Sequence, residues 1–500
     1  MILRFRVVAI LAVAISAAPL LRSGGRVARA AAAHDVGHDW PMMGFNVQGD
    51  NASPWSTGIT AANVKTLRLR QVPLDGAVDA SAIYLHGVTV KGAVRDVFLV
   101  TTTYGKTIAI DADSGTILWE YTPPQYTSWA GTPQITNSTP AADPNRLYIY
   151  ASTPGGEVVK LAVSDGHAIW STPVTLAPQS EKLSAPLKVF RGHVIAVTGG
   201  YIGDRPPYQG HVAIVDATSG KLLNVWNSLC SDRSGLLQPA SCDGQQSAIW
   251  GKSGPAIDEA TGNIFVATGN GSYDGKTNWG DSLLEINASA TQMVGNYTPA
   301  NNAEINRRDL DLGATSPVLM GDGVVAQGGK DALIRLVSIK DMAGTAPHAG
   351  HELQTVPTPG SLMLLTSLAK WTSNDRTWLF SADYGVFRPG GGVSAWTYAG
   401  GQLTPAWKND NPGTSPVVAG GLLYVYDAPA GGLRVYNPES GELLANLPCG
   451  KGHWNTPIVA DGRIALPEGI TVGWVFGQGV VHNYASSGVL DIWSLPDKRN

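Results

Sequence analysis

The chain is poor in charge, in cysteine and in helical pattern, and each shortage excludes a class of protein. Charged residues make up 15% of the 500 residues, the formal net charge is −4, and no long lysine or arginine block occurs. We therefore expect no nucleic-acid partner held by phosphate neutralisation. Three cysteines cannot build a disulfide scaffold, so a hydrophobic core must stabilise the fold. No segment has the periodicity of an amphipathic helix.

Long apolar runs are absent except near the N-terminus. Two arginines precede an apolar run from Val7 to about Leu21, and alanine-rich stretches follow. This pattern predicts a secretory signal peptide over residues 1–33 and a mature protein that begins near His34. A membrane anchor is the alternative, but the run is short and Pro19 interrupts it. We expect a periplasmic or secreted protein without a transmembrane span after cleavage.

Glycine and proline are abundant, with 59 and 32 residues, and they punctuate a repeated phrase. The phrase is an alternating strand, Asp or a similar polar residue, a Ser/Thr-Gly turn, and a second strand that ends near tryptophan. Eight copies occur, at residues 107–119, 158–170, 212–226, 281–287, 332–338, 392–407, 433–441 and 488–493. A unit that recurs about every fifty residues predicts an all-β, eight-bladed β-propeller.

A second phrase, a small residue followed by proline and an apolar strand, introduces most of these units. Proline is tolerated in the first strand of a blade, where a missing ladder donor does little harm. The copies are Thr139-Pro140, Ala185-Pro186, Gly254-Pro255, Ser316-Pro317, Ser415-Pro416 and Thr456-Pro457.

The eighth unit ends after Trp493, one strand short of a full blade. The early segment Thr66 to Pro73 has the pattern of the missing outer strand, so we expect it to close the ring with the last blade. Residues 34–500 then form one propeller domain. Closure removes the open sheet edge, which suits a monomer.

The repeated phrase resembles the repeat of the pyrroloquinoline quinone (PQQ) family of quinoprotein alcohol dehydrogenase-like propellers. Residues 39–45 and 59–65 resemble the N-terminal segment of its exported dehydrogenases. The resemblance covers nearly the whole mature chain and is nearest to the polyvinyl-alcohol dehydrogenase-like branch. It implies an eight-bladed propeller with PQQ and a calcium or lanthanide ion in the central funnel, which oxidises a small or polymeric alcohol by hydride transfer to the quinone.

The resemblance also implies two binding residues. Ile249-Trp-Gly251 is similar to the segment whose tryptophan forms the floor under the quinone, which implicates Trp250. Residues 266–271 are similar to the strand end that supplies an asparagine oxygen to the metal, which implicates Asn270. The ordinary alternatives are a packing tryptophan and an Asn-Gly turn.

Residues 308–313 are similar to the segment that carries the catalytic base, which implicates Asp309 as base and metal neighbour. Asp311 resembles the additional acidic residue of members that use a lanthanide. Neighbouring arginines offer both carboxylates a plain salt bridge as the alternative. Lys330 matches the basic side chain that contacts the quinone oxygens, although a loop lysine is solvated by default.

Several features depart from the family pattern. The chain lacks the adjacent cysteine pair found above the quinone in dehydrogenases of the methanol and ethanol type. Tyr201 stands where a metal-binding glutamate is expected, and Asp204 is the possible substitute. No Cys-x-x-Cys-His haem site is present, so electrons would pass to a separate acceptor.

The cysteines themselves are sparse but not uninformative. Cys230 and Cys242 lie twelve residues apart in one loop, which allows a disulfide in an oxidising compartment. Cys449 is left over, and we expect it to be buried.

Three functions remain open at this point. The first is a divergent PQQ- and metal-dependent alcohol dehydrogenase. The second is a non-catalytic propeller that binds a protein partner in the cell envelope, and the third is a binder of a glycan or another polymer. Convergence of Asn270, Asp309 and Lys330 over Trp250 would favour the first. An apolar patch on the rim with a filled funnel would favour the second.

Overall fold

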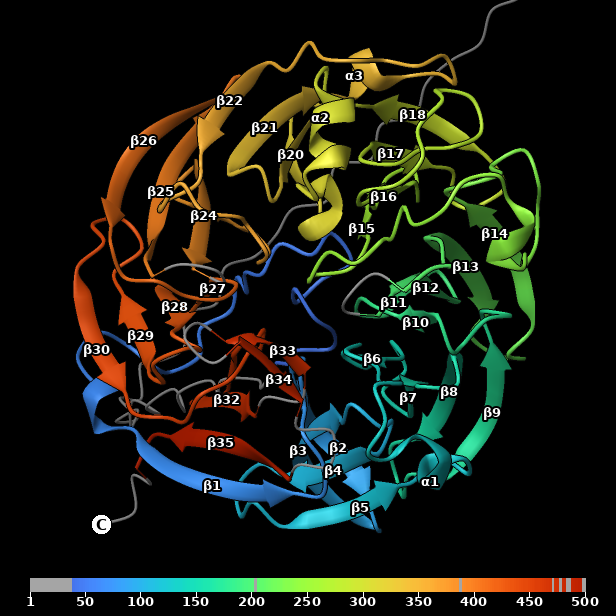
Figure 1. Ribbon diagram of the computed structural model, residues 1–500. Coiled ribbons are helices and arrows are strands. Elements are labelled where there is room, and N and C mark those ends of the chain that lie inside the picture. The colour runs from blue at the N-terminus through green and yellow to red at the C-terminus, as the bar shows by residue number, and fades with distance from the viewer. Residues whose placement is uncertain are drawn as a thin grey trace, which may run out of the picture. The chain divides into compact units, whose positions relative to one another are not determined.

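The computed structural model describes residues 38–201, 205–385, 389–469, 472–475, 479–482 and 487–496. Within these residues, eight antiparallel sheets of four or five strands follow one another around a central axis (Figure 1). The predicted all-β, eight-bladed propeller is therefore confirmed.

The first four blades are β2 (Ile83–Val90), β3 (Ala93–Thr101), β4 (Thr107–Asp111) and β5 (Ile117–Tyr121); β6 (Ala141–Ala142), β7 (Tyr148–Thr153), β8 (Glu157–Ala162) and β9 (Ala168–Pro173); β10 (Glu181–Leu183), β11 (Lys188–Phe190), β12 (His193–Gly200), β13 (His211–Asp216) and β14 (Leu222–Asn227); and β15 (Ala256–Ile257), β16 (Ile264–Ala267), β17 (Leu283–Ile286) and β18 (Met293–Tyr297).

The last four blades are β19 (Val318–Gly321), β20 (Val324–Gly328), β21 (Leu333–Ser338) and β22 (Gln354–Pro357); β23 (Ala369–Ser373), β24 (Arg376–Tyr384), β25 (Gly391–Ala399) and β26 (Gln402–Asn409); β27 (Val417–Ala419), β28 (Leu422–Tyr426), β29 (Leu433–Tyr436) and β30 (Leu443–Leu447); and β31 (Ile458–Ala460), β32 (Arg463–Glu468), β35 (Gly488–Ser494) and β1 (Arg68–Leu74). A separate hairpin pairs β33 (Val472–Val475) with β34 (Gly479–His482).

Helices contribute little, as the sequence predicts. The described helical segments are α1 (Tyr126–Trp129), α2 (Asn302–Arg307), α3 (Ile339–Met342), η1 (Val64–Thr66), η2 (Pro239–Ser241) and η3 (Leu312–Ala314). No helix in the described part of the chain has the length and apolar character needed to cross a membrane.

In the first three blades, the repeated phrase forms the two outer strands and the turn between them. In the first blade, the Asp111 carboxylate accepts hydrogen bonds from the backbone N–H groups of Asp113 and Ser114, at 3.2 and 2.8 Å. Gly115 follows with φ of 72°, a conformation that glycine adopts without strain. The Asp-x-x-x-Gly pattern is therefore a turn that holds β4 against β5.

In the first two blades, the tryptophan of the phrase packs on the turn glycine of the next blade. Trp119 donates from Nε1 to the carbonyl oxygen of Val163 at 2.9 Å. A Cβ on Gly166, the turn glycine of the next blade, would lie 2.5 Å from the Trp119 ring. A Cβ on Gly220 would likewise lie 2.7 Å from the Trp170 ring. The glycine is thus required both by the turn and by the ring that packs on it.

The ring closes through the N-terminal strand. β1 pairs antiparallel with β35 over seven positions, from Arg68 opposite Ser494 to Leu74 opposite Gly488. The sheet order is β1-β35-β32-β31, so β1 is the outer strand of the eighth blade. This confirms the predicted closure. The sequence did not predict the separate hairpin of β33 and β34, which lies between β32 and β35 along the chain.

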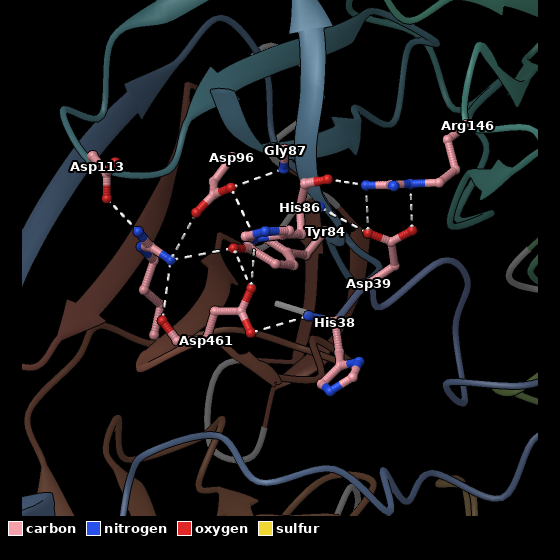
Figure 2. A network of polar contacts seen from close by, with 10 residues as sticks. His38, Asp39, Tyr84, His86, Gly87, Asp96, Asp113, Arg146 and Asp461 are labelled. Atoms are coloured by element: carbon pink, nitrogen blue, oxygen red, sulfur yellow. Dashed lines mark hydrogen bonds and ion pairs between the residues drawn. The ribbon is translucent and has the colours of Figure 1, made fainter. Parts of the chain in front are cut away.

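A polar network joins the first and last blades at this closure (Figure 2). His86 Nδ1 lies 3.1 Å from Asp96 and 3.0 Å from Asp461. The Tyr84 hydroxyl donates to Asp461 at 2.9 Å. Arg463 donates to the Tyr84 oxygen at 3.2 Å and lies 3.3 Å from Asp96. The guanidinium therefore balances part of the acidic charge.

The segment that leads into the propeller is tied to the same network. The backbone N–H of His38 donates to Asp461 at 3.1 Å, and Asp39 pairs with Arg146 at 2.8 Å. Trp40 exchanges two backbone hydrogen bonds of 2.9 Å with Tyr84. The described N-terminal residues thus span the first two blades and the last one (Figure 2).

The structure joins Cys230 and Cys242 by a disulfide, with 5.8 Å between their Cα atoms. Cys449 is a free cysteine of intermediate burial, less buried than the sequence predicts.

Candidate functional site

Two tryptophans and a lysine meet where the loops enter the inner strands. Trp250 precedes β15 and Trp454 precedes β31, and their ring centroids lie 6.0 Å apart at an interplanar angle of 48°. The Lys252 ammonium lies 3.3 Å from the Trp454 centroid and 5.4 Å from that of Trp250. Aromatic faces with a cation beside them suit a flat, anionic ligand.

Lys330 lies between the aromatic floor and two aspartates. Its Nζ is 5.3 Å from the Trp250 ring centroid, 2.8 Å from Asp309 and 3.1 Å from Asp311. Burial lowers the pKa of Lys330, but Asp311 and Asp309 outweigh that effect and raise the pKa above its usual value. The lysine is therefore a fixed cation. The structure thus brings together four residues that the sequence singles out.

The two carboxylates differ in exposure. The Asp309 side chain is 58% exposed, whereas that of Asp311 is 6% exposed. Asp309 follows α2 with φ of 55°, so the chain turns sharply before Asp311. One carboxylate is open to a substrate and the other is held in the protein.

Asn270 reaches this group through its backbone. Its N–H donates to Asp311 Oδ1 at 3.2 Å, and its carbonyl oxygen accepts from the N–H of Ser247 at 2.8 Å. A Cβ on the preceding Gly269 would lie 3.1 Å from both Asp311 Oδ2 and Trp250 Nε1. The chain therefore passes closely between the tryptophan and the carboxylate, and glycine makes that passage possible.

Asp281, directly before β17, is a further acid that the sequence reasoning did not assign to the site. It is buried, and its Oδ1 accepts from the N–H of Leu312 at 3.1 Å. Its Oδ2 is buried with no hydrogen-bond partner among the described residues. Burial, together with the charge of Asp311, raises the pKa of Asp281 well above its usual value.

The acid side of the funnel therefore fits a hard cation. Three aspartates share one ammonium, and one buried carboxylate oxygen is unsatisfied. Oxygen ligands of this kind are those that calcium and similar ions prefer.

The opposite side is built around a buried aspartate. Asp79 Oδ2 lies 3.0 Å from His453 Nδ1 and accepts from Asn137 Nδ2 at 2.8 Å. Burial raises the pKa of Asp79, but His453 and Lys252 outweigh that effect and lower it to about 2. Asp79 is thus ionised and holds the histidine that stacks on Trp454, with centroids 3.8 Å apart.

Two lysines make this side rich in cations. Burial lowers the pKa of Lys182 to about 8 and that of Lys252 to about 7. The Lys182 ammonium donates to Asn137 Oδ1, and Asp79 is the acid whose charge opposes both shifts. Two cations and a histidine around one carboxylate fit an anionic ligand.

The structure does not make Tyr201 a metal ligand. Its hydroxyl donates to the carbonyl oxygen of Pro178 at 2.8 Å, and its ring lies 5.6 Å from the Lys182 ammonium. Asp204, the possible substitute, lies outside the described residues.

A cavity of about 580 Å³ opens beside Lys330. Arg308, Leu310, Asp331 and Tyr384 are among its lining residues. Its volume is in the range of small-molecule sites, and Lys330 connects it to the funnel.

Comparison with known proteins adds family information to this geometry. Residues 52–237 match the family described as outer membrane protein assembly factor BamB. The quinohemoprotein alcohol dehydrogenase ADH IIB of Pseudomonas putida is 27% identical over 275 residues, which cover 51% of this chain and 38% of that protein. The polyvinylalcohol dehydrogenase of Sphingopyxis sp. (strain 113P3) is 23% identical over 209 residues, which cover 39% and 31%.

Solved structures show the same fold. The quinohemoprotein alcohol dehydrogenase of Comamonas testosteroni superposes with a TM-score of 0.66 at 16% identity, covering 92% of this chain and 81% of that one. A europium-containing methanol dehydrogenase has a TM-score of 0.63 at 15% identity, covering 91% and 98%. The predicted resemblance to PQQ-repeat propellers is confirmed. The aligned region spans less than two fifths of either sequence relative.

A positional signal could have found the residues that sequence reasoning missed. Asn137, Lys182, Lys252 and Trp454 each stand three or four residues before a recurring proline, where the chain enters an inner strand. In these four blades, the polar or aromatic residue at that position contacts another member of the site. Asp281 carries no such signal.

Proposed function

We propose that the chain is an exported quinoprotein dehydrogenase that oxidises an alcohol and passes electrons to a separate acceptor. One observation carries the proposal: the Lys330 ammonium lies 2.8 Å from Asp309, 3.1 Å from Asp311 and 5.3 Å from the Trp250 ring. Four residues chosen from sequence thus meet at one point. The proposed protein is a periplasmic or secreted monomer after removal of residues 1–33.

The chain's own residues divide the work of binding. Trp250 offers its ring face to a planar quinone, and Lys182, Lys252 and Lys330 offer cations to the quinone's anionic groups. Asp281 and Asp311, with Asn270, would hold a calcium or lanthanide ion. When bound, PQQ supplies the acceptor for the hydride of the alcohol.

Asp309 is the proposed base. Its exposed carboxylate can accept the hydroxyl proton of an alcohol, and the Lys330 ammonium, 2.8 Å away, holds that carboxylate in place. The cavity beside Lys330 gives the alcohol room to approach. Whether a small or a polymeric alcohol is used depends on this cavity.

The test uses the full mature protein with PQQ and calcium, and separately with PQQ and a lanthanide ion. Quinone binding and dye-coupled oxidation of an alcohol panel are measured together. We expect Asp309→Asn to bind quinone but to lose turnover by about 10²- to 10⁴-fold, the usual range for a general base. Asp322→Asn is the matched control, because Asp322 is also an aspartate with positive φ, at 51°, but lies exposed in the turn after β19.

Absence of quinone binding with both ions would overturn the proposal. The second candidate, a scaffold for an envelope protein, would then lead. It is favoured by the family match over residues 52–237 and by two exposed apolar side chains on adjacent blades, Val94 at 74% and Leu147 at 62%. Charged substitutions there would weaken capture of such a partner.

A further inference from the structure

A second cluster of potential metal ligands lies away from the quinone floor. Cys449 follows β30, Glu468 ends β32 and Asp491 lies within β35. The Cys449 sulfur and one carboxylate oxygen from each acid all lie within 4.8 Å of one another. The three residues come from two blades and are joined only by the fold.

The cluster has acidic charge without a cation. Glu468 is 8% exposed and Asp491 is 0% exposed. No lysine, arginine or histidine in the described part of the chain forms an ion pair with either. A buried charge without a partner is unfavourable unless a proton or another cation neutralises it.

Asp491 provides an unsatisfied ligand atom. Its Oδ1 accepts from Gln71 Nε2 at 3.0 Å, whereas its Oδ2 is buried with no hydrogen-bond partner among the described residues. In the described part of the chain, no basic side chain forms an ion pair with Asp491 Oδ2.

The backbone orients the other two ligands. The N–H of Gly432 donates to the Cys449 sulfur at 3.0 Å, and the N–H of Gly450 donates to Glu468. A Cβ on Gly450 would collide with the Glu468 carboxylate. These N–H groups fix the direction in which the sulfur and the carboxylate face. Burial and the nearby acids raise the pKa of the Cys449 thiol to about 12, so a metal would bind there with release of the thiol proton.

We propose that Cys449, Glu468 and Asp491 bind a thiophilic divalent cation such as zinc. One thiolate and two carboxylates match the ligand types of zinc, with bonds of about 2.3 Å to sulfur and about 2.0 to 2.2 Å to oxygen. The present separations need only small side-chain adjustments to reach such bonds. Three protein ligands leave one position for water.

A second group with the same spacing serves as an internal comparison. His86, Asp96 and Asp461 also place their ligand atoms within 4.8 Å of one another. There, however, Arg463 lies 3.3 Å from Asp96 and Tyr84 donates to Asp461. The chain supplies its own cation at that group (Figure 2), so we propose no metal there.

The proposed cation would anchor a loop that serves the funnel. Cys449 begins the segment whose other end places His453 on Asp79 and Trp454 beside Trp250. The cation site nevertheless stands independently of the dehydrogenase proposal, because none of its ligands contacts the quinone floor residues in the described contacts.

Cobalt(II) is the probe, because a thiolate ligand gives it a strong charge-transfer absorption in the near ultraviolet. The metal-stripped, full mature protein is titrated without reductant, so that Cys230–Cys242 stays closed. We expect one cobalt per chain, displaced by zinc. Cys449→Ser should abolish the charge-transfer band. Glu468→Gln should weaken binding about a hundredfold, at the upper end of the loss that follows removal of an outer-shell partner.

His86→Asn is the matched control and should leave the band and the affinity unchanged. Absence of the band in the folded wild-type protein would overturn the proposal without any variant. A band that persists in Cys449→Ser would overturn it as well. Because no quinone is present, this result does not depend on whether the chain binds PQQ.

Discussion

The two ends of the loop from Cys449 to Trp454 differ in the sign of their uncompensated charge. At the outer end, two buried carboxylates and a thiol have no cation. At the inner end, His453 and two lysines surround the single carboxylate of Asp79. Buried groups of one sign are unfavourable alone, which supports the two proposals made above: a metal ion at the outer end and an anionic ligand at the inner end.

The network at the ring closure shows the balanced case. Arg463, at the start of β32, pairs with Asp96 and Asp113, while Glu468 ends the same strand without a cation. The acids beside Arg463 at the start of β32 are thus paired with a cation, whereas Glu468 at the end of the strand is not. Two experiments test this contrast. Replacing Arg463 removes the cation of the closure network, and adding zinc supplies a cation to the group that contains Glu468.

The largest expected effect follows from removing the built-in cation. Arg463→Met leaves acidic side chains at the closure without their partner, and its side chain is 13% exposed. We expect the free energy of unfolding to fall by about 3 kcal/mol, as for other broken pairs that are largely buried. Urea unfolding measures the change.

Arg68→Met is the control for that variant. Arg68 is exposed on β1, so its replacement should change the free energy of unfolding by less than about 0.5 kcal/mol. Equal effects of the two substitutions would show that the network does not stabilise the closure.

A smaller effect is expected from supplying the missing cation. Zinc at a hundred times its dissociation constant should raise the free energy of unfolding of the metal-free wild type by about 2.7 kcal/mol. Asp491→Asn keeps an oxygen for Gln71 and places a neutral amide beside Glu468, so without zinc it should cost little. The same variant should lose the gain from zinc.

Urea unfolding with and without zinc measures both quantities. A zinc effect that survives in Asp491→Asn would place the ion elsewhere. A large loss in the metal-free variant would show that Asp491 stabilises the fold through contacts other than a cation.

The sequence predicted those features that depend on local pattern. The Asp-x-x-x-Gly turn at 111–115 and the tryptophan that follows it could be predicted because the turn, the strand and the tryptophan lie within a few residues of one another. The closing strand could be predicted because the last blade lacked one. Trp250 and Lys330 were found through family resemblance, which carries information that local pattern lacks.

The missed residues depend on contacts between distant parts of the chain. Asp79 and His453 are 374 residues apart and meet because the ring closes. Cys449, Glu468 and Asp491 likewise come from two blades. No sequence periodicity marks such a group, because its members come together only when the ring closes.

The smallest expected effect is a pH dependence at the cation-rich end. Burial lowers the pKa of Lys252 to about 7 and that of Lys182 to about 8, so both ammonium groups are lost as pH rises from 6 to 9. The affinity for PQQ, an anion, should therefore fall by about tenfold over this range. Lys252→Met should bind more weakly at pH 6 and show a flatter profile, whereas the exposed Lys221→Met should match the wild type.

Stability without quinone should change in the opposite direction. Between about pH 7 and the ordinary lysine pKa of about 10.4, the unfolded chain binds more protons than the folded protein at Lys182 and Lys252. The contribution of these groups to the free energy of unfolding is therefore full above that range and is lost as pH falls to about 7. Quinone affinity that stays constant or rises with pH in the wild type would show that Lys182 and Lys252 do not bind the anion. An anionic ligand at the inner end of the loop would then be excluded.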